Sequence, residues 1–273
     1  MNPLPGALLL IGHPVSHSLS PAFQNAALRH AGIALDYTAM DVPPERFADA
    51  VAHIRATHAA GNVTVPHKIS MFDACTEVTP IAERAGAVNA FRALDDDQLV
   101  GHNTDVGGVN HAVRELIGHP RGLTITLLGA GGAAAAVLAA AASWDAEVRV
   151  RSRSYERAKE LVEQVHPDAH VLRRVVDTLE GADIIINATT LGMSEDDDLP
   201  CEASELEPQT AVLDLVFRPN ETRWVRECRA RGLRAADGRE MLLEQGALAF
   251  EWWLGVPPDR EVMRTALLAT PRH

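Results

Sequence analysis

The side chains best suited to chemistry lie in four short polar clusters within the first 105 residues, each at the expected end of a strand. These clusters are His17–Pro21, Gly61–Lys68, Gly86–Asn89 and Gly101–Asp105. Neutral hydroxyl and amide groups dominate them, as a polyhydroxylated ligand would require. Lys68 and Asp105 are the obvious titratable pair. The pattern therefore predicts a site for a small hydroxylated molecule with one ammonium group and one carboxylate.

A glycine-rich turn indicates a second kind of site. Gly129-Ala130-Gly131-Gly132-Ala133-Ala134 fits GxGxxA, directly after the leucine-rich run Leu123–Leu128 and at the mouth of an alanine-rich helix. Such glycines permit a tight turn, let the backbone approach a pyrophosphate and aim helix N–H groups at the anion. The alternative is an ordinary glycine turn before a helix.

The next strand distinguishes between nucleotides. An NAD site places a carboxylate about twenty residues on, but here the stretch is Arg151-Ser152-Arg153-Ser154, flanked by Arg149 and Arg157. A guanidinium and serine hydroxyls bind a 2′-phosphate that a carboxylate would repel, so the stretch predicts NADP. The alternative is the solvated face of an edge strand, which suits Arg149 and Arg151 best.

A metal site is not expected. The histidines His13, His17, His67 and His102 lack HExxH-like spacing, and the three cysteines are widely spaced without a CxxC. Three unpaired cysteines favour a reducing cytoplasm over a disulfide framework. The first residues show neither a signal peptide nor a membrane span.

The elements around these residues alternate as in an α/β protein with largely parallel strands. A helix is expected to start at Ser20 as N-cap, followed by Pro21. Asp95-Asp96-Asp97 is expected to be a hairpin turn. Strands are expected at Ala7–Gly12, Asp36–Val42, Gly61–Val65, Val88–Leu94, Leu99–Asn103, Leu123–Leu128, Glu147–Val150, Ala182–Asn187 and Thr210–Val216.

In the second series a helix is expected between each pair of strands, and two helices, Arg239–Leu254 and Asp259–Leu268, are expected to close the chain. The 273 residues allow two domains of ordinary size. We expect a substrate domain of residues 1–104 and 238–273, and a nucleotide domain of residues 105–237. The net charge of −12 argues against nucleic-acid and anionic-membrane partners.

Taken together, the motifs resemble the shikimate dehydrogenase family over nearly the whole chain. The resemblance is carried by the blocks SLSP, GNVTVPHK, GAVN, GHNTD, GAGGA, INATTLGM, DLVFRP and QGA, in this order and spacing. It implies two α/β domains, the second of Rossmann type, facing each other across a cleft. It leaves a homodimer open.

The resemblance also implies a role for each matching residue. Lys68 and Asp105 match the catalytic pair, and Ser18 and Ser20 match the serines that hold the substrate carboxylate. The residues that match hydroxyl-binding positions are Asn62, Thr64, Asn89 and Gln245. The pyrophosphate loop corresponds to Gly129, Ala130, Gly131, Gly132 and Ala133, and the 2′-phosphate pocket to Ser152, Arg153, Ser154 and Arg157. Met193, Leu215 and Gly238 would flank the nicotinamide.

The implied reaction is the reversible reduction of 3-dehydroshikimate to shikimate by NADPH. Negative charge develops on the ketone oxygen, and a positioned ammonium such as that of Lys68 stabilises it and supplies the proton. Structural alternatives remain at this stage. Asp105 and Ser20 also suit helix N-caps, and Asn62 and Asn89 suit turns, whereas Ser18 has no such local role.

Two positions depart from the family pattern. Phe217 stands where tyrosine is common, and Gln24 replaces a histidine of the first helix. Phe217 keeps open a quinate/shikimate or aminoshikimate dehydrogenase that uses NAD. Rivals of other kinds are a nucleotide-binding regulator without activity and a folate- or glutamyl-type reductase. The retained Lys68 and Asp105 speak against the regulator, and the SLSP and GNVTVPHK clusters speak against the other reductases.

Overall fold

The computed structural model describes residues 4–173, 179–218 and 221–269. The chain divides into two compact units, Met1–Gly107 with Leu243–His273 and Gly108–Leu242. The sequence predicts that the chain passes from one domain to the other at 104/105 and at 237/238. In the structure both boundaries between the units lie a few residues further along the chain, inside the helices α5 (Asp105–Ile117) and α9 (Arg239–Leu254).

Unit 1, the first of these, is built on a mixed sheet of the order β2-β1-β3-β5-β6-β4. Its strands are β1 (Leu8–Gly12), β2 (Tyr37–Asp41), β3 (Ala60–Val63), β4 (Glu77–Val78), β5 (Ala90–Ala93) and β6 (Leu99–His102). The expected hairpin is confirmed, because β5 pairs antiparallel with β6 and both Asp96 and Asp97 adopt positive φ. β5 is antiparallel to β3 as well, so this sheet is less parallel than predicted.

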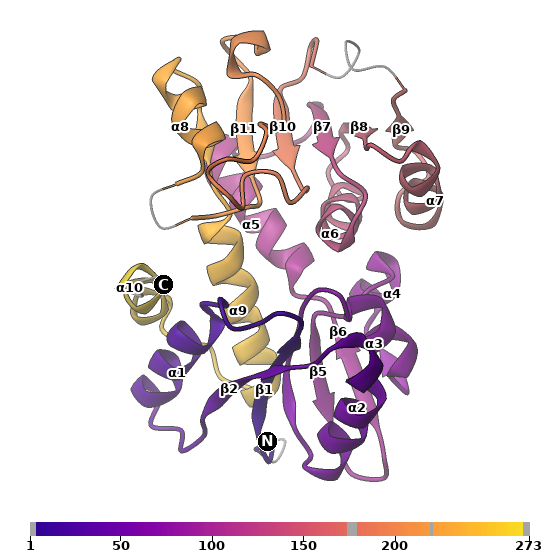
Figure 1. Ribbon diagram of the computed structural model, residues 1–273, viewed down its shortest axis with the longest axis vertical. Helices are drawn as coiled ribbons and strands as arrows, with labels where there is room; N and C mark the ends of the chain where they lie inside the picture. Colours follow the sequence, from indigo (N-terminus) through magenta and orange to yellow (C-terminus); the bar gives the residue numbers. More distant parts are fainter. Residues whose placement is uncertain (1–3, 174–178, 219–220, 270–273) are drawn as a thin grey trace. The chain divides into compact units, whose positions relative to one another are not determined.

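Helices cover the sheet of unit 1 and close its core. They are α1 (Ser20–His30), the short 3₁₀ turn η1 (Pro44–Arg46), α2 (Phe47–Ala56), α3 (Lys68–Ala74), α4 (Pro80–Ala85) and α10 (Arg260–Ala269). Ile11 of β1, Ile54 of α2 and Phe91 of β5 are fully buried together in one apolar cluster. α1 packs against α10, as Figure 1 shows, so the last helix belongs to the same unit as the first.

Unit 2 holds an all-parallel sheet of the order β12-β11-β10-β7-β8-β9. Its strands are β7 (Thr124–Leu128), β8 (Glu147–Arg151), β9 (His170–Val171), β10 (Ile184–Asn187), β11 (Ala211–Asp214) and β12 (Ala235–Ala236). Its helices are α6 (Gly132–Ala141), α7 (Tyr155–Val165) and α8 (Arg223–Ala230), with a 3₁₀ turn η3 (Ala203–Glu205). Figure 1 shows the strands β11, β10, β7, β8 and β9 side by side in this order, with α7 next to β9 at the edge of the sheet. The fold is α/β with a Rossmann-type second unit, as predicted.

One expected helix is absent. The described segment between β10 and β11 contains only η3, where we had predicted a helix. The Asp197 carboxylate accepts hydrogen bonds from the backbone N–H groups of Gly192 (3.2 Å) and Ser194 (2.8 Å). These bonds, together with the positive φ of Gly192, favour a looped backbone there.

Candidate active site

Lys68 and Asp105 form a direct ion pair within unit 1. Lys68 begins α3, Asp105 begins α5, and the Lys68 Nζ donates to Asp105 Oδ2 at 2.6 Å. The two side chains are 18% and 7% exposed. A short, largely buried and charge-assisted hydrogen bond of this kind fixes the position of the ammonium group. The predicted pair is therefore brought together by two helix starts that lie 37 residues apart in the chain.

The second oxygen of Asp105 is also occupied. The Asn89 Nδ2 donates to Asp105 Oδ1 at 2.8 Å, and Asn89 Oδ1 accepts from the backbone N–H of Thr104 at 2.6 Å. Asp105 therefore turns its carboxylate toward Lys68 and Asn89. An N-cap function falls instead to Asn103, whose Oδ1 accepts from the backbone N–H of Val106 at 3.3 Å.

Two further predicted residues join this network. The Asn89 Nδ2 lies 3.4 Å from Gln245 Oε1 on α9, and the Asn62 Nδ2 donates to the Asn89 carbonyl at 3.0 Å. Asn62 Oδ1 in turn accepts from the Tyr37 hydroxyl at 2.8 Å. Burial raises the pKa of Tyr37, so its hydroxyl stays a donor. Sequence reasoning missed Tyr37, because it lies on β2, outside every motif.

The two serines take local roles different from those expected. Leu19, not Ser20, occupies the cap of α1, and Ser20 is its first helical residue. Ser18 Oγ accepts a hydrogen bond from the Ser20 backbone N–H at 3.3 Å, so Ser18 satisfies the first N–H group of α1. Thr64 follows directly after β3, and its backbone N–H donates to the Ile11 carbonyl at 2.8 Å.

Gln24, one of the two departures from the family pattern, joins α1 to α9. Its Nε2 donates to the Gly246 carbonyl at 2.9 Å, next to Gln245. The side chain is almost fully buried, and Gln24 Oε1 has no partner among the described residues. The glutamine thus anchors the part of α9 that presents Gln245.

Unit 2 contains a pocket of about 640 Å³ at the carboxyl ends of its strands. It is lined by Leu128, Gly129, Ala130, Gly131, Arg151, Ser152, Arg153, Ser154, Arg157, Leu172, Arg173, Ala188, Thr189, Thr190, Leu191 and Pro200. Gly129 has φ +120°, and a Cβ there would lie 2.7 Å from the Ala188 carbonyl oxygen. The cap of α6 is Gly131, with no side-chain cap bond, so the first N–H groups of α6 are left for a ligand anion.

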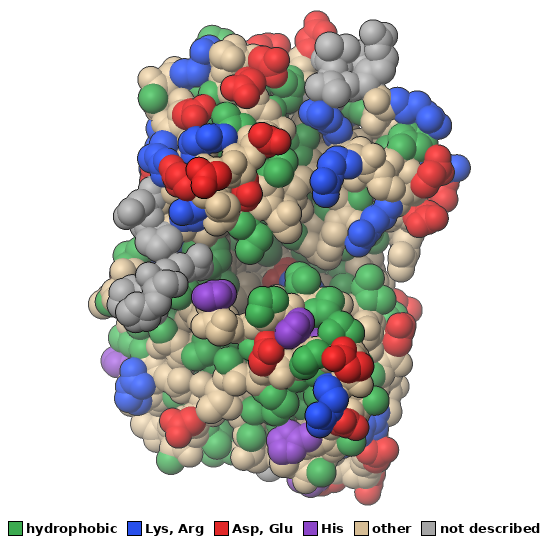
Figure 2. All heavy atoms as spheres, viewed as in Figure 1, with side chains coloured by type: hydrophobic (Ala, Val, Ile, Leu, Met, Phe, Trp, Pro, Cys, Tyr) green, Lys and Arg blue, Asp and Glu red, His purple; other side chains and the backbone are tan. Residues whose placement is uncertain are grey.

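The arginine-serine turn after β8 forms one wall of this pocket. Ser154 also caps α7, since its Oγ accepts from the Arg157 backbone N–H at 3.4 Å. Arg151 lines the pocket, which corrects the alternative that it merely faces solvent, whereas Arg149 pairs with Glu147 at 2.7 Å. Figure 2 shows Lys and Arg side chains gathered over the region of β8 and α7. A 2′-phosphate fits such a wall.

Five predicted cofactor residues do not line this pocket. They are Gly132, Ala133, Met193, Leu215 and Gly238. Gly132 and Ala133 form the first turn of α6, and Met193 is 66% exposed. Leu215 and Gly238 are neighbours, because a Cβ on Gly238 would lie 2.3 Å from the Leu215 carbonyl oxygen.

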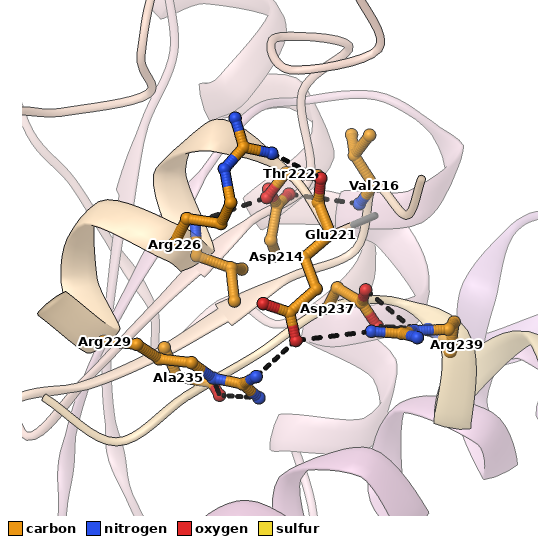
Figure 3. Close-up of polar contacts among 10 residues, drawn as sticks. Asp214, Val216, Glu221, Thr222, Arg226, Arg229, Ala235, Asp237 and Arg239 are labelled. Carbon is orange, nitrogen blue, oxygen red and sulfur yellow. Dashed lines mark hydrogen bonds and ion pairs between the residues drawn. The ribbon is translucent and has the colours of Figure 1, made fainter. Parts of the chain in front are cut away.

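A polar network braces the loops that carry these residues. Asp214, at the end of β11, is fully buried, and its Oδ1 accepts from Asn187 Nδ2 at 2.8 Å while its Oδ2 accepts from the Thr222 hydroxyl at 2.7 Å. Figure 3 shows Asp214 facing Thr222 and the Val216 amide. Burial raises the pKa of Asp214 to about 6. The hydrogen bonds that the carboxylate accepts act in the opposite direction and offset part of this rise.

A second set of contacts in Figure 3 joins the same loop to α8 and to the start of α9. Glu221 lies between Arg229 and Arg239, and Arg239 also pairs with Asp237 at 2.9 Å. These ion pairs therefore include Asp237 and Arg239, the two residues on either side of Gly238. Sequence reasoning did not single out any of these four residues.

The described residues hold no group of three or more His, Cys, Asp or Glu side chains placed to bind a metal ion. None of their helices has the length and the apolar character that crossing a membrane requires.

A Rossmann-type unit with an arginine-lined pocket, in a chain whose other unit holds a largely buried lysine–aspartate pair, is typical of nicotinamide-nucleotide-dependent dehydrogenases. Family profiles match three stretches of the chain. They describe the shikimate dehydrogenase substrate binding domain (residues 10–91), shikimate / quinate 5-dehydrogenase (112–194) and the shikimate 5'-dehydrogenase C-terminal domain (238–268). The chain belongs to the shikimate dehydrogenase family.

Individual relatives align with this chain over almost its full length. The shikimate dehydrogenase (NADP(+)) of Methanopyrus kandleri is 40% identical over 272 residues, covering 95% of this chain and 93% of the relative. The crystal structure of the Thermus thermophilus shikimate 5-dehydrogenase with NADP(H) and shikimate matches with a TM-score of 0.86 and 34% identity, covering 96% and 98% of the two chains. The quinate dehydrogenase of Corynebacterium glutamicum in complex with NAD matches with a TM-score of 0.89 and 27% sequence identity. The match covers 97% of this chain and 99% of that one.

Proposed function

We propose that Lys68 and Asp105 carry the proton transfer of an NADP-dependent shikimate dehydrogenase, which interconverts 3-dehydroshikimate and shikimate in aromatic amino-acid biosynthesis. The observation that carries the proposal is the 2.6 Å bond between the Lys68 Nζ and Asp105 Oδ2, held in place by Asn89. The names of the relatives and the NADP(H) and shikimate bound in the Thermus thermophilus structure support the activity and the cofactor.

The pocket of unit 2 fits the nucleotide. In this proposal Gly129 to Ala133 and the α6 N-terminus hold the pyrophosphate, while Ser152, Arg153, Ser154 and Arg157 hold the 2′-phosphate. When bound, the nucleotide donates or accepts a hydride at its nicotinamide ring. The loops that carry Met193, Leu215 and Gly238 would flank that ring.

The chain's own contribution to the chemistry is electrostatic and acid–base. The Lys68 ammonium stabilises the negative charge that develops on the substrate oxygen during reduction, and it supplies the proton. In the direction of oxidation the same nitrogen accepts the hydroxyl proton. Asp105 keeps the nitrogen in one position, and Asn89 prevents the carboxylate from turning away.

The remaining polar groups of unit 1 would bind the substrate. We assign the carboxylate to Ser18 and Ser20, and the ring hydroxyls to Asn62, Thr64, Asn89 and Gln245. Unit 1 is thereby proposed as the substrate domain and unit 2 as the nucleotide domain. The three free cysteines fit a reducing compartment, and on that ground we place the protein in the cytoplasm.

Replacement of Lys68 tests the catalytic assignment. Lys68→Ala should lower kcat by ~10²–10⁴-fold, the range for a lost acid–base group, while the affinity for NADPH stays unchanged. The chain offers a matched control, because Lys159 on α7 is its only other lysine and is exposed. Lys159→Ala should leave kcat at the wild-type value. Equal turnover in both variants would remove Lys68 from the mechanism.

A four-way comparison of initial rates tests the substrate. Shikimate with NADP should give the highest kcat/KM among the pairings of shikimate or quinate with NADP or NAD. Phe217 and the likeness to the quinate dehydrogenase favour quinate as the second candidate. A higher kcat/KM for quinate with NAD would establish that candidate instead.

A further inference from the structure

We propose that Arg173 is a further determinant of the preference for NADP over NAD, held against the ring of Tyr155 at the end of the pocket that receives the 2′-phosphate. The inference rests on the proposed nucleotide site of unit 2. It adds a residue that lies outside every motif of the sequence, twenty positions beyond Arg153.

The sheet places Arg173 next to the arginine-serine turn. β9 is the outermost strand and pairs parallel with β8, with Arg149 opposite His170 and Val150 opposite Val171. The Leu172 backbone N–H continues the pairing by donating to the Val150 carbonyl at 2.9 Å. Arg173 therefore leaves the sheet beside the end of β8, and it lines the same pocket as Arg151 and Arg153.

Tyr155 orients the Arg173 side chain. The guanidinium carbon lies 3.7 Å from the centroid of the Tyr155 ring, which is the geometry of a cation–π contact. Tyr155 is the first residue of α7 and directly follows Ser154. The contact thus ties Arg173 to the serine-arginine turn, so that less side-chain freedom is lost when an anion binds.

The charge in this pocket exceeds what the pyrophosphate requires. Four arginines line it, Arg151, Arg153, Arg157 and Arg173, and no acidic side chain is among its lining residues. Within the described part of the chain none of the four forms an ion pair with a carboxylate, in contrast to Arg149, which is paired with Glu147. In a protein of net charge −12, such a local excess of guanidinium groups indicates a dianionic group in addition to the one at the α6 N-terminus.

Nucleotide fragments measure this role without turnover. Adenosine 2′,5′-bisphosphate and adenosine 5′-monophosphate differ only in the 2′-phosphate, and titration calorimetry gives the Kd of each. Arg173→Ala should weaken binding of the bisphosphate roughly tenfold, as expected for one lost charge-assisted contact, and change that of the monophosphate less than twofold. Arg149→Ala removes the same charge from the neighbouring strand and should change neither.

The kinetic counterpart is the ratio of kcat/KM for NADP to that for NAD with shikimate as substrate. Arg173→Ala should lower this ratio about tenfold. Tyr155→Phe should leave it unchanged, because the ring remains, whereas Tyr155→Leu should lower it by a smaller factor.

The outcomes separate this inference from the function on which it rests. If Arg153→Ala lowers the NADP/NAD ratio of kcat/KM and Arg173→Ala does not, the role of Arg173 is refuted and the nucleotide site stands. Equal weakening of both fragments by Arg173→Ala would show a contact with a group that the two fragments share, which also overturns the specificity role. Absence of bisphosphate binding to the wild-type protein would refute both the nucleotide site and this inference.

Discussion

The hydrogen bonds of Asn89 show how little freedom the residues around Lys68 have. Its side-chain nitrogen lies within hydrogen-bond distance of acceptor oxygens on Asp105, Thr104 and Gln245, and its side-chain oxygen accepts from the Thr104 backbone N–H. An asparagine with so many protein partners cannot also turn toward a substrate without giving up one of them. We therefore expect Asn89 to hold Asp105 in place in the free protein and to exchange one of these bonds for a ring hydroxyl when the substrate binds.

Asp214 is a buried carboxylate whose ionisation affects stability. Because burial raises its folded-state pKa to about 6, above the ordinary 3.8, the folded protein binds the proton more tightly than the unfolded chain does. The stability that Asp214 contributes is thus fully present below about pH 4 and is lost as the pH rises through 6. Asp237 adds to this upward shift of the pKa.

Asp214→Asn should remove this dependence. In urea unfolding between pH 4.5 and 7, the variant should gain stability relative to wild type as the pH rises, by an amount on the order of 2 kcal/mol. Asp49→Asn on α2 is the control, since Asp49 is 68% exposed. A stability difference between wild type and Asp214→Asn that does not vary with pH would contradict the buried-charge account.

At the scale of the element, the turn between β7 and α6 combines two demands on one residue. Gly129 has a positive φ and lies against the Ala188 carbonyl, so an alanine there meets both backbone strain and a steric clash. Displacement of this turn would move the α6 N–H groups that we assign to the pyrophosphate.

Gly129→Ala should therefore destabilise the protein by more than about 1 kcal/mol and raise the Kd for NADPH at least tenfold. Gly118→Ala is a matched control, because Gly118 has φ +78° but open space around its Cα. The Gly118→Ala variant should lose stability only because alanine disfavours the positive φ, and it should bind NADPH with the Kd of the wild type. Equal effects of the two changes on Kd would show that the close approach to Ala188 is unimportant.

The same scale shows what the sequence could predict. The glycine turn, the hairpin at Asp96 and the two closing helices were predictable because each depends on residues adjacent in the chain. The two-residue strands β4, β9 and β12 are too short to produce a periodic pattern. The missing helix before β11 depends on hydrogen bonds from one side chain, Asp197, which composition does not reveal.

The candidate site was predictable to a similar degree. Lys68, Asp105, Asn62, Asn89 and Gln245 were named from their motifs, and they share one network in unit 1. Tyr37 and Arg173 were not, because each acts through a partner that only the fold brings near. The N-cap predicted at Ser20 is wrong, because Leu19 occupies the cap of α1. The alternative of an Asp105 cap is not borne out, because Asn103 accepts from the Val106 N–H at the start of α5.

At the scale of the whole molecule, unit 1 depends on the last part of α9. Trp253 is 1% exposed, its ring stacks on Tyr37 with a centroid distance of 5.8 Å, and its carbonyl accepts a hydrogen bond from Arg92 at 2.6 Å. Through Tyr37 this indole also supports Asn62. Loss of the ring would leave a large cavity in unit 1 alone.

Trp253→Ala should lower the free energy of unfolding of unit 1 by about 3–5 kcal/mol and raise the KM for shikimate. Binding of adenosine 2′,5′-bisphosphate to unit 2 should be retained at 25 °C. The neighbouring Trp252, only half-buried, provides the control, and Trp252→Ala should destabilise less. Parallel loss of nucleotide binding and of shikimate turnover would show that the two units do not respond independently.

The route of the chain through its units has a consequence for synthesis on the ribosome. Unit 1 begins with residues up to Gly107 and is finished only by residues from Leu243 onward, whereas unit 2 is one uninterrupted stretch. Gln245, Trp253 and the helix that packs on α1 therefore emerge after every residue of the nucleotide pocket. A nascent chain of which only the residues up to 242 have emerged would hold every residue of the pocket that we propose for the nucleotide, while unit 1 still lacks its last helices. Such an intermediate would bind NADP without oxidising shikimate.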